Sequence, residues 1–208
     1  MTTNRLEAFS DGVLAIIITI MVLEFKVPNG NTFAELAPYA PKLLSYLLCF
    51  AMVGIYWNNH HHMMQATRFV NGAVLWANLH LLFWLSLVPF CNAWMGASSF
   101  ANLPTFAFGL VLFLSAVAFT LLEKTIIRYE RECGVLADAI GDGKKEKISL
   151  LVYFIALPMA WIAPFVSVAC HFLVALIWIV PDKRLEALLE EQERRDYAAR
   201  QERELGTD

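Results

Sequence analysis

Charged side chains are scarce in this chain, and their scarcity excludes an ordinary soluble domain. Only 17% of the 208 residues are Asp, Glu, Lys or Arg, whereas 58% are hydrophobic, and the mean hydropathy is +0.53. Soluble domains carry roughly 25% charged residues. Apolar runs of about 17–25 residues recur, which is the length that crosses a hydrocarbon core as a helix. The sequence therefore predicts an all-α, polytopic membrane protein.

Motifs that carry chemistry are missing as well. There is no GxSxG or HExxH motif, no glycine-rich phosphate loop and no acidic pair within an apolar run, so we predict that the chain is not an enzyme. No basic face indicates a nucleic-acid partner. The TVGYG carbonyl filter is absent, so no reentrant filter loop is expected. The scattered cysteines form no CxxC pair, and we expect no metal site and no cofactor; they are Cys49, Cys91, Cys133 and Cys170.

The apolar runs and their breaks predict six membrane spans. Four of them cover residues 8–27, 41–64, 71–94 and 104–122. The fifth begins near Ile148 and the sixth ends near Val180. Because Pro158 and Pro164 would break this last run, two short helices with a tight turn are expected, and one long kinked helix is the alternative.

Basic residues predict the orientation of the spans. Under the six-span arrangement, one side of the membrane holds Arg5, Arg68, Lys124, Arg128, Arg131, Lys144, Lys145, Lys147, Lys183 and Arg184. The other side holds Lys26 and Lys42. The positive-inside rule then puts both termini in the cytoplasm. We expect residues 1–181 to form the transmembrane domain and residues 182–208 a charged cytosolic helix or tail.

The most informative polar residues stand where the first span begins. Asp11 lies two residues before an apolar run from Val13 to Leu23 that Thr19 alone interrupts. A charge at the edge of hydrocarbon is usually kept for a partner or a pathway. Asp11 could equally cap the helix. Arg5 is not spaced to meet Asp11 on one helix face, so a tertiary or intersubunit pairing is more natural.

Four side chains of the first span lie on one face of its predicted helix. Ile16, Thr19, Ile20 and Leu23 fall at i, i+3, i+4 and i+7. Because every face of this helix is apolar, periodicity alone leaves core packing, lipid contact and a pore lining all open. The Thr19 hydroxyl could face an ion or bond back to the carbonyl of residue 15.

A dense polar cluster ends the second span: Asn58, Asn59, His60, His61 and His62. Three consecutive imidazoles point in three directions on a helix, so they cannot all bind one metal ion. We expect one of them to make an interhelical hydrogen bond, for example to Asp11 or Arg5.

The segment Arg5-x-x-x-Phe9-Ser10-Asp11-Gly12-Val13-x-Ala15-Ile16 closely resembles the first-helix signature of the transmembrane protein 175 family. Members of that family are potassium-permeable channels known from endosomes and lysosomes, with bacterial relatives. Trp57 with His60 and His61, and Leu87-Val88-Pro89-Phe90 at the end of the third span, look similar too. A single signature in a chain of this length resembles the bacterial form. That resemblance implies a homotetramer around a central pore in the bacterial inner membrane.

The resemblance also implies roles for individual residues. The first helices would line the pore, with aliphatic rings of Ile16, Ile20 and Leu23 and a hydroxyl ring of Thr19. A narrow apolar neck can gate by dewetting. A structural network would hold the pore helix in register; its members would be Arg5, Phe9, Ser10, Asp11, Gly12, Trp57, His60 and His61.

The expected function is therefore a potassium-permeable cation channel with a hydrophobic constriction. Its expected partners are further copies of the chain, monovalent cations, chiefly potassium, and membrane lipid. The alternative is a proton-coupled secondary transporter that uses Asp11 and His60. A channel passes current along the electrochemical gradient, whereas such a carrier saturates and depends strongly on pH.

Overall fold

The chain folds into a bundle of long helices. The computed structural model describes residues 3–28, 30–67, 69–129 and 143–179, together with Arg194 and Gln201. The helices are α1 (Thr3–Leu23), α2 (Phe33–Leu36), the 3-10 turn η1 (Ala37–Tyr39), α3 (Ala40–Ala66), α4 (Gly72–Ser86), α5 (Val88–Ala97), α6 (Asn102–Tyr129), α8 (Lys144–Ile162) and α9 (Pro164–Ile179). The predicted all-α class is confirmed. The predicted tail, residues 182–208, lies outside the described residues except for Arg194 and Gln201.

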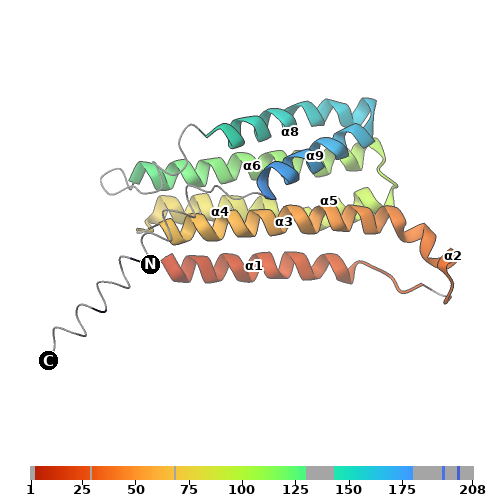
Figure 1. Ribbon diagram of the computed structural model, residues 1–208, viewed down its shortest axis with the longest axis horizontal. Helices are drawn as coiled ribbons and strands as arrows, with labels where there is room; N and C mark the ends of the chain where they lie inside the picture. The colour runs from red at the N-terminus through yellow and green to blue at the C-terminus, as the bar shows by residue number, and fades with distance from the viewer. Residues whose placement is uncertain are drawn as a thin grey trace.

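The long helices run back and forth along one axis (Figure 1). We call the side of the bundle where α1 begins the N-side. From there α1 runs to the opposite side, α3 returns, α4 and α5 cross again, and α6 returns. The pair α8 and α9 packs on α6, whereas α1 packs mainly on α3, α4 and α5. The first helix therefore occupies an edge of the bundle, away from α8.

Within the described residues, four helical stretches are long and apolar enough to cross a membrane: Thr3–Leu23, Phe33–Ala66, Gly72–Ala97 and Asn102–Tyr129. They correspond to the first four predicted spans, although α1 begins and ends earlier than the predicted residues 8–27. The last two predicted spans correspond to α8, whose first turn is charged, and to the shorter apolar helix α9. The count of six spans stays a prediction.

The third predicted span is divided at Leu87, where α4 ends and α5 follows. Pro89 has no backbone N–H, so the carbonyl of Leu85 lacks its usual partner four residues on. The Leu87 N–H bonds the carbonyl of Trp84 at 3.2 Å, as in a 3-10 turn. The two halves therefore meet at a proline-induced break.

The last apolar run is also divided, but at only one of its two prolines. Pro158 lies inside α8, so the expectation that it breaks the run is wrong. The helix ends at Ile162, and Ala163 takes φ −151° and ψ 83°. A residue before proline avoids the α region, and proline suits the first position of a new helix. Pro164 therefore places the turn, and α8 and α9 form the expected helical hairpin.

A close contact between α6 and α9 holds the hairpin on the bundle. His171 of α9 is fully buried, and its ring lies 5.7 Å from the ring of Phe108 and 5.8 Å from that of Tyr153, between centroids. A Cβ atom added at Gly109 of α6 would lie 2.9 Å from His171 Nε2. The absence of a side chain at Gly109 therefore leaves room for the His171 ring against α6.

We expect Gly109→Ala to lower the free energy of unfolding by about 1–3 kcal/mol, because the added methyl overpacks a site where rings enclose His171. Thermal unfolding in detergent measures the effect. Gly72→Ala is the control, since a Cβ there meets no atom within 4 Å. Equal melting temperatures for the two variants would contradict the packing argument.

Candidate pore-lining helix

The helix α1 has one buried face and one exposed face. Its buried side chains are Leu6, Ser10, Leu14, Ile17 and Met21, which recur at helical spacing and pack against the rest of the bundle. The opposite face is uncovered. A helix at the edge of a bundle with a continuous exposed face is free to meet lipid, another copy of the chain or an aqueous pathway.

The four predicted pore-lining residues all lie on the exposed part of α1. The exposed fractions are 58% for Ile16, 41% for Ile20 and 80% for Leu23, and Thr19 is exposed too. The Thr19 hydroxyl shares its one hydrogen between the carbonyls of Ala15 and Ile16, at 3.0 Å each. Its oxygen lone pairs therefore remain available on the exposed face.

A buried hydrogen-bond chain fixes α1 against α4 and α3. The Ser10 hydroxyl donates to the Leu6 carbonyl at 2.9 Å and accepts from Asn78 Nδ2 at 2.9 Å. Asn78 Oδ1 lies 2.7 Å from His60 Nε2. Because Oδ1 can only accept, His60 Nε2 carries the hydrogen. Ser10, Asn78 and His60 are almost entirely buried.

A second set of contacts joins α1 to α3 beside this chain. Trp57 Nε1 donates to Asp11 Oδ1 at 3.0 Å. His61 Nδ1 lies 2.7 Å from Glu7 Oε1, and the His61 ring stacks on Trp57 with centroids 5.9 Å apart. Asp11 lies well inside a helix that starts at Thr3, so its proposed role as a helix cap is wrong. Its carboxylate instead bonds to a neighbouring helix.

The remaining residues of the signature point away from these contacts. Arg5 and Phe9 are exposed, and the Arg5 side chain makes no hydrogen bond or ion pair with any of the described residues. Gly12 is exposed as well, and a Cβ atom there would meet nothing within 4 Å. The structure thus brings Ser10, Asp11, Trp57, His60 and His61 into contacts between helices and leaves Arg5, Phe9 and Gly12 facing outward.

Sequence reasoning missed two members of the network, Asn78 and Glu7. An amide in the middle of an apolar helix is costly unless it is bonded, so Asn78 could have been suspected. Glu7 lies one helical turn before Asp11, on the side of α1 that faces α3. Its partner, His61, belongs to another helix, and spacing along the chain does not reveal that pairing.

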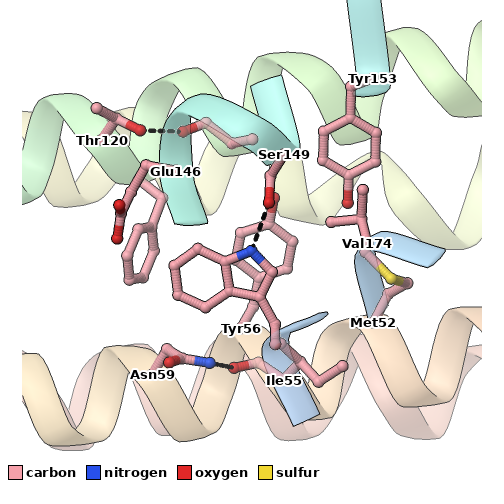
Figure 2. Close-up of a pocket in the computed structure, with 12 residues that line it drawn as sticks. Met52, Ile55, Tyr56, Asn59, Thr120, Glu146, Ser149, Tyr153 and Val174 are labelled. Atoms are coloured by element: carbon pink, nitrogen blue, oxygen red, sulfur yellow. Dashed lines mark hydrogen bonds between the residues drawn. The ribbon is translucent and has the colours of Figure 1, made fainter. Parts of the chain in front are cut away.

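A separate cavity lies between α3, α6, α8 and α9 (Figure 2). Its volume is about 40 Å³, and aromatic side chains including Tyr56, Phe119 and Trp178 line it. The Trp178 Nε1 donates to Ser149 Oγ across it at 2.7 Å. A cavity of this size holds a few water molecules at most. Nor do any three His, Cys, Asp or Glu side chains lie close enough to hold a metal ion, within the part of the chain that the structure describes.

Comparison with known proteins places the chain that contains this helix in a family. Residues 5–89 match the family model described as endosomal/lysosomal potassium channel TMEM175. A relative from Chryseobacterium sp. (strain P1-3), named a potassium channel, is 53% identical over 191 residues, which cover 92% of this chain and all of the relative. The chain belongs to the TMEM175 family. It is therefore an integral membrane protein of an ion-channel family and not an enzyme.

Other TMEM175 proteins match over different shares of their length. The crystal structure of a homologue from Chamaesiphon minutus, described as that of a lysosomal potassium-selective channel homologue, superposes with a TM-score of 0.74 at 28% identity. That match covers 87% of this chain and 98% of the homologue. Human TMEM175, named an endosomal/lysosomal proton channel, is 26% identical over 80% of this chain but only 36% of its own length.

In this TMEM175 chain, Asn78 is the residue that joins Ser10 to His60. We expect Asn78→Leu to lower the free energy of unfolding by about 1–3 kcal/mol, since it removes two buried hydrogen bonds and leaves the Nε2–H of His60 without a partner. Thermal unfolding in detergent measures the loss. The control is Ser115→Ala, because that buried hydroxyl bonds only the Val111 carbonyl of its own helix. If both variants melt alike, the chain of bonds does not hold α1.

Proposed function

We propose that this protein is a potassium-permeable cation channel in which four copies surround one pore lined by their α1 helices. The observation that carries the proposal is the exposed aliphatic face of α1 at the edge of the bundle. Membership of the TMEM175 family supports it, because the relatives from Chryseobacterium and from Chamaesiphon minutus are both named potassium channels.

Within the residues that the structure describes, a single copy offers no path for an ion. Its described interior is filled by apolar side chains, and the cavity of about 40 Å³ lies away from α1. A pore between copies needs a face that one copy leaves uncovered, and α1 provides it. In a cyclic assembly each α1 would present Ile16, Ile20 and Leu23 to the axis, with Thr19 as a ring of hydroxyls between them.

The constriction in this proposal is hydrophobic. Aliphatic rings of this kind hold no stable water column when narrow, so they close the pore without a charged gate. Ser10 and Asp11, with Trp57, His60 and His61, would hold α1 in register. Arg5, Phe9 and Gly12 would form the contacts between copies. Conduction would need no cofactor, and the permeant ion would be potassium.

We propose six spans with the N-side in the cytoplasm of a bacterial cell and the chain in its inner membrane. Among the described residues, Lys124, Arg128 and Lys147 stand at the N-side ends of α6 and α8. Lys26 and Lys42 stand near the opposite ends of α1 and α3. This asymmetry supports cytoplasmic termini through the positive-inside rule.

The alternative, a proton-coupled transporter, is not favoured. It needs Asp11 and His60 to act together, yet Asp11 bonds Trp57 and His60 bonds Asn78. The relatives whose names give a function are named channels.

We expect Ile16→Asn to raise the potassium flux several-fold in liposomes that contain the purified protein, because an amide wets an aliphatic neck. Leu23→Asn should act in the same direction. Leu173→Asn is the matched control, since Leu173 is exposed on α9, far from the proposed pore. A conducting wild type whose flux is unaffected by both α1 variants would remove this face from the pore.

We expect Thr19→Val to reduce the preference for potassium over sodium, because it replaces a hydroxyl by a methyl of the same shape. Reversal potentials in mixed potassium and sodium solutions measure the preference. Thr19→Ser, which keeps the hydroxyl, should retain it. An unchanged reversal potential in Thr19→Val would show that the hydroxyl ring does not select the ion.

A further inference from the structure

The exposed face of α8 is cationic in its first turn and apolar along the rest of its length. Lys144 and Lys147 are exposed, and every exposed residue from Ile148 to Ile162 is apolar. These exposed side chains recur every three or four residues, singly or as neighbouring pairs, so they form one stripe along the helix. The stripe begins with two ammonium groups and continues as aliphatic and aromatic side chains.

The acidic side chains near this end of α8 are turned inward. Glu146 stands between the lysines in sequence, but with Ser149 and Tyr153 it lines the cavity between α3, α6, α8 and α9 (Figure 2). The other acidic residue among the described parts of α6 and α8 is Glu123, which is 6% exposed. The first turn of α8 thus separates its charges, with the carboxylate inside and the ammonium groups outside.

The stability of the helix does not explain these lysines. The first turn of a helix is the positive end of its macrodipole, where cations are disfavoured. Three of the first four residues of α8 are nevertheless lysines, and Gly143, which precedes them, gives the helix no side-chain cap. The positive-inside rule accounts for basic residues on this side of the membrane, but not for their separation from the acidic ones. An anion at the surface would account for both.

Further cations stand at the same end of the bundle. Lys124 and Arg128 are exposed four residues apart near the end of α6, which packs along α8 and extends past its start (Figure 1). Lys145 leans toward α9, and its Nζ lies 5.9 Å from the centroid of the Trp178 ring. Long basic side chains of this kind keep their stems on apolar surface and their charges at the headgroup level.

The apolar part of the stripe matches the depth of one leaflet. From Ile148 to Ile162 the helix rises about 21 Å, at 1.5 Å per residue. One leaflet contributes about 15 Å of hydrocarbon, half of the full core. An acyl chain that starts beside Lys147 therefore meets apolar side chains over its whole length. The exposed residues of α9 are all apolar too, which widens this surface.

We infer that an anionic phospholipid binds at the start of α8, with its phosphate between Lys144 and Lys147 and its acyl chains along the apolar stripe. Residues three apart on a helix lie close enough to share one phosphate group. A soluble phosphate would leave the stripe unused, and a zwitterionic lipid would bring its own cation to a cationic surface. The inference goes beyond the proposed channel and does not depend on how many copies assemble.

The test measures lipid binding to the purified full chain by native mass spectrometry in mild detergent. Phosphatidylglycerol and phosphatidylcholine with identical acyl chains are the two probes. The wild type should bind its first phosphatidylglycerol at least tenfold more tightly than phosphatidylcholine. The double change Lys144→Gln and Lys147→Gln should weaken phosphatidylglycerol binding at least tenfold, because each lysine near an anionic headgroup contributes about fivefold. Phosphatidylcholine binding should not change.

Two controls separate this site from a general effect of charge. Lys26→Gln removes an exposed lysine on the opposite side of the bundle and should leave phosphatidylglycerol binding unchanged. The double change Lys144→Arg and Lys147→Arg keeps both charges and should retain the binding.

Three results would overturn the inference. One is equal affinity of the wild type for the two lipids, and another is a loss in Lys26→Gln as large as that in Lys147→Gln. The third is displacement of phosphatidylglycerol by inorganic phosphate at the same concentration, because such a site would take a free anion and make no use of the apolar stripe.

Discussion

The bond chain from Leu6 through Ser10 and Asn78 to His60 is what allows α1 to stand at the edge of the bundle. In a membrane, apolar contact alone gives little preference for a helix neighbour over lipid. An edge helix held only by Leu14, Ile17 and Met21 could rotate or slide. Directional bonds at buried positions remove that freedom, and the other face of α1 stays uncovered.

The same bonds determine which side chains of α1 can line a pore. Successive residues on a helix are separated by about 100°, so a small rotation of α1 exchanges one set of exposed residues for another. A turn by one residue would replace Leu23 by Glu24 and Ile16 by Ile17 on a given line. Placing aliphatic rings on the axis therefore demands that Ser10 and Asp11 be anchored on the other side. In the arrangement we propose, α1 therefore carries both the face turned toward the pore and the residues that anchor it.

The sequence could predict the elements but not their partners. Apolar runs located α3 and α6 closely, because a helix that crosses hydrocarbon needs a long run of apolar residues in the sequence. Of the two prolines expected to break the last run, Pro164 does so, whereas Pro158 lies inside α8, since a proline inside a membrane helix is tolerated when the surrounding packing allows it. Asn78 was missed because its role comes from hydrogen bonds to Ser10 and His60, which are far from it in sequence. The exposed stripe of α1 was found by spacing, but only tertiary structure separates it from the buried stripe one step around the helix.

The anchor and the constriction are not independent in the arrangement we propose. Ile16 belongs to the face turned toward the pore, and the bonds of Ser10 and Asp11 hold the same helix from its other side. One α1 cannot rotate about its axis without straining those bonds. A rotation that moves the aliphatic rings off the pore axis must therefore also break or replace the contacts with Asn78 and Trp57. The resistance of α1 to rotation lies in these bonds, and the aliphatic rings set how narrow the closed neck is.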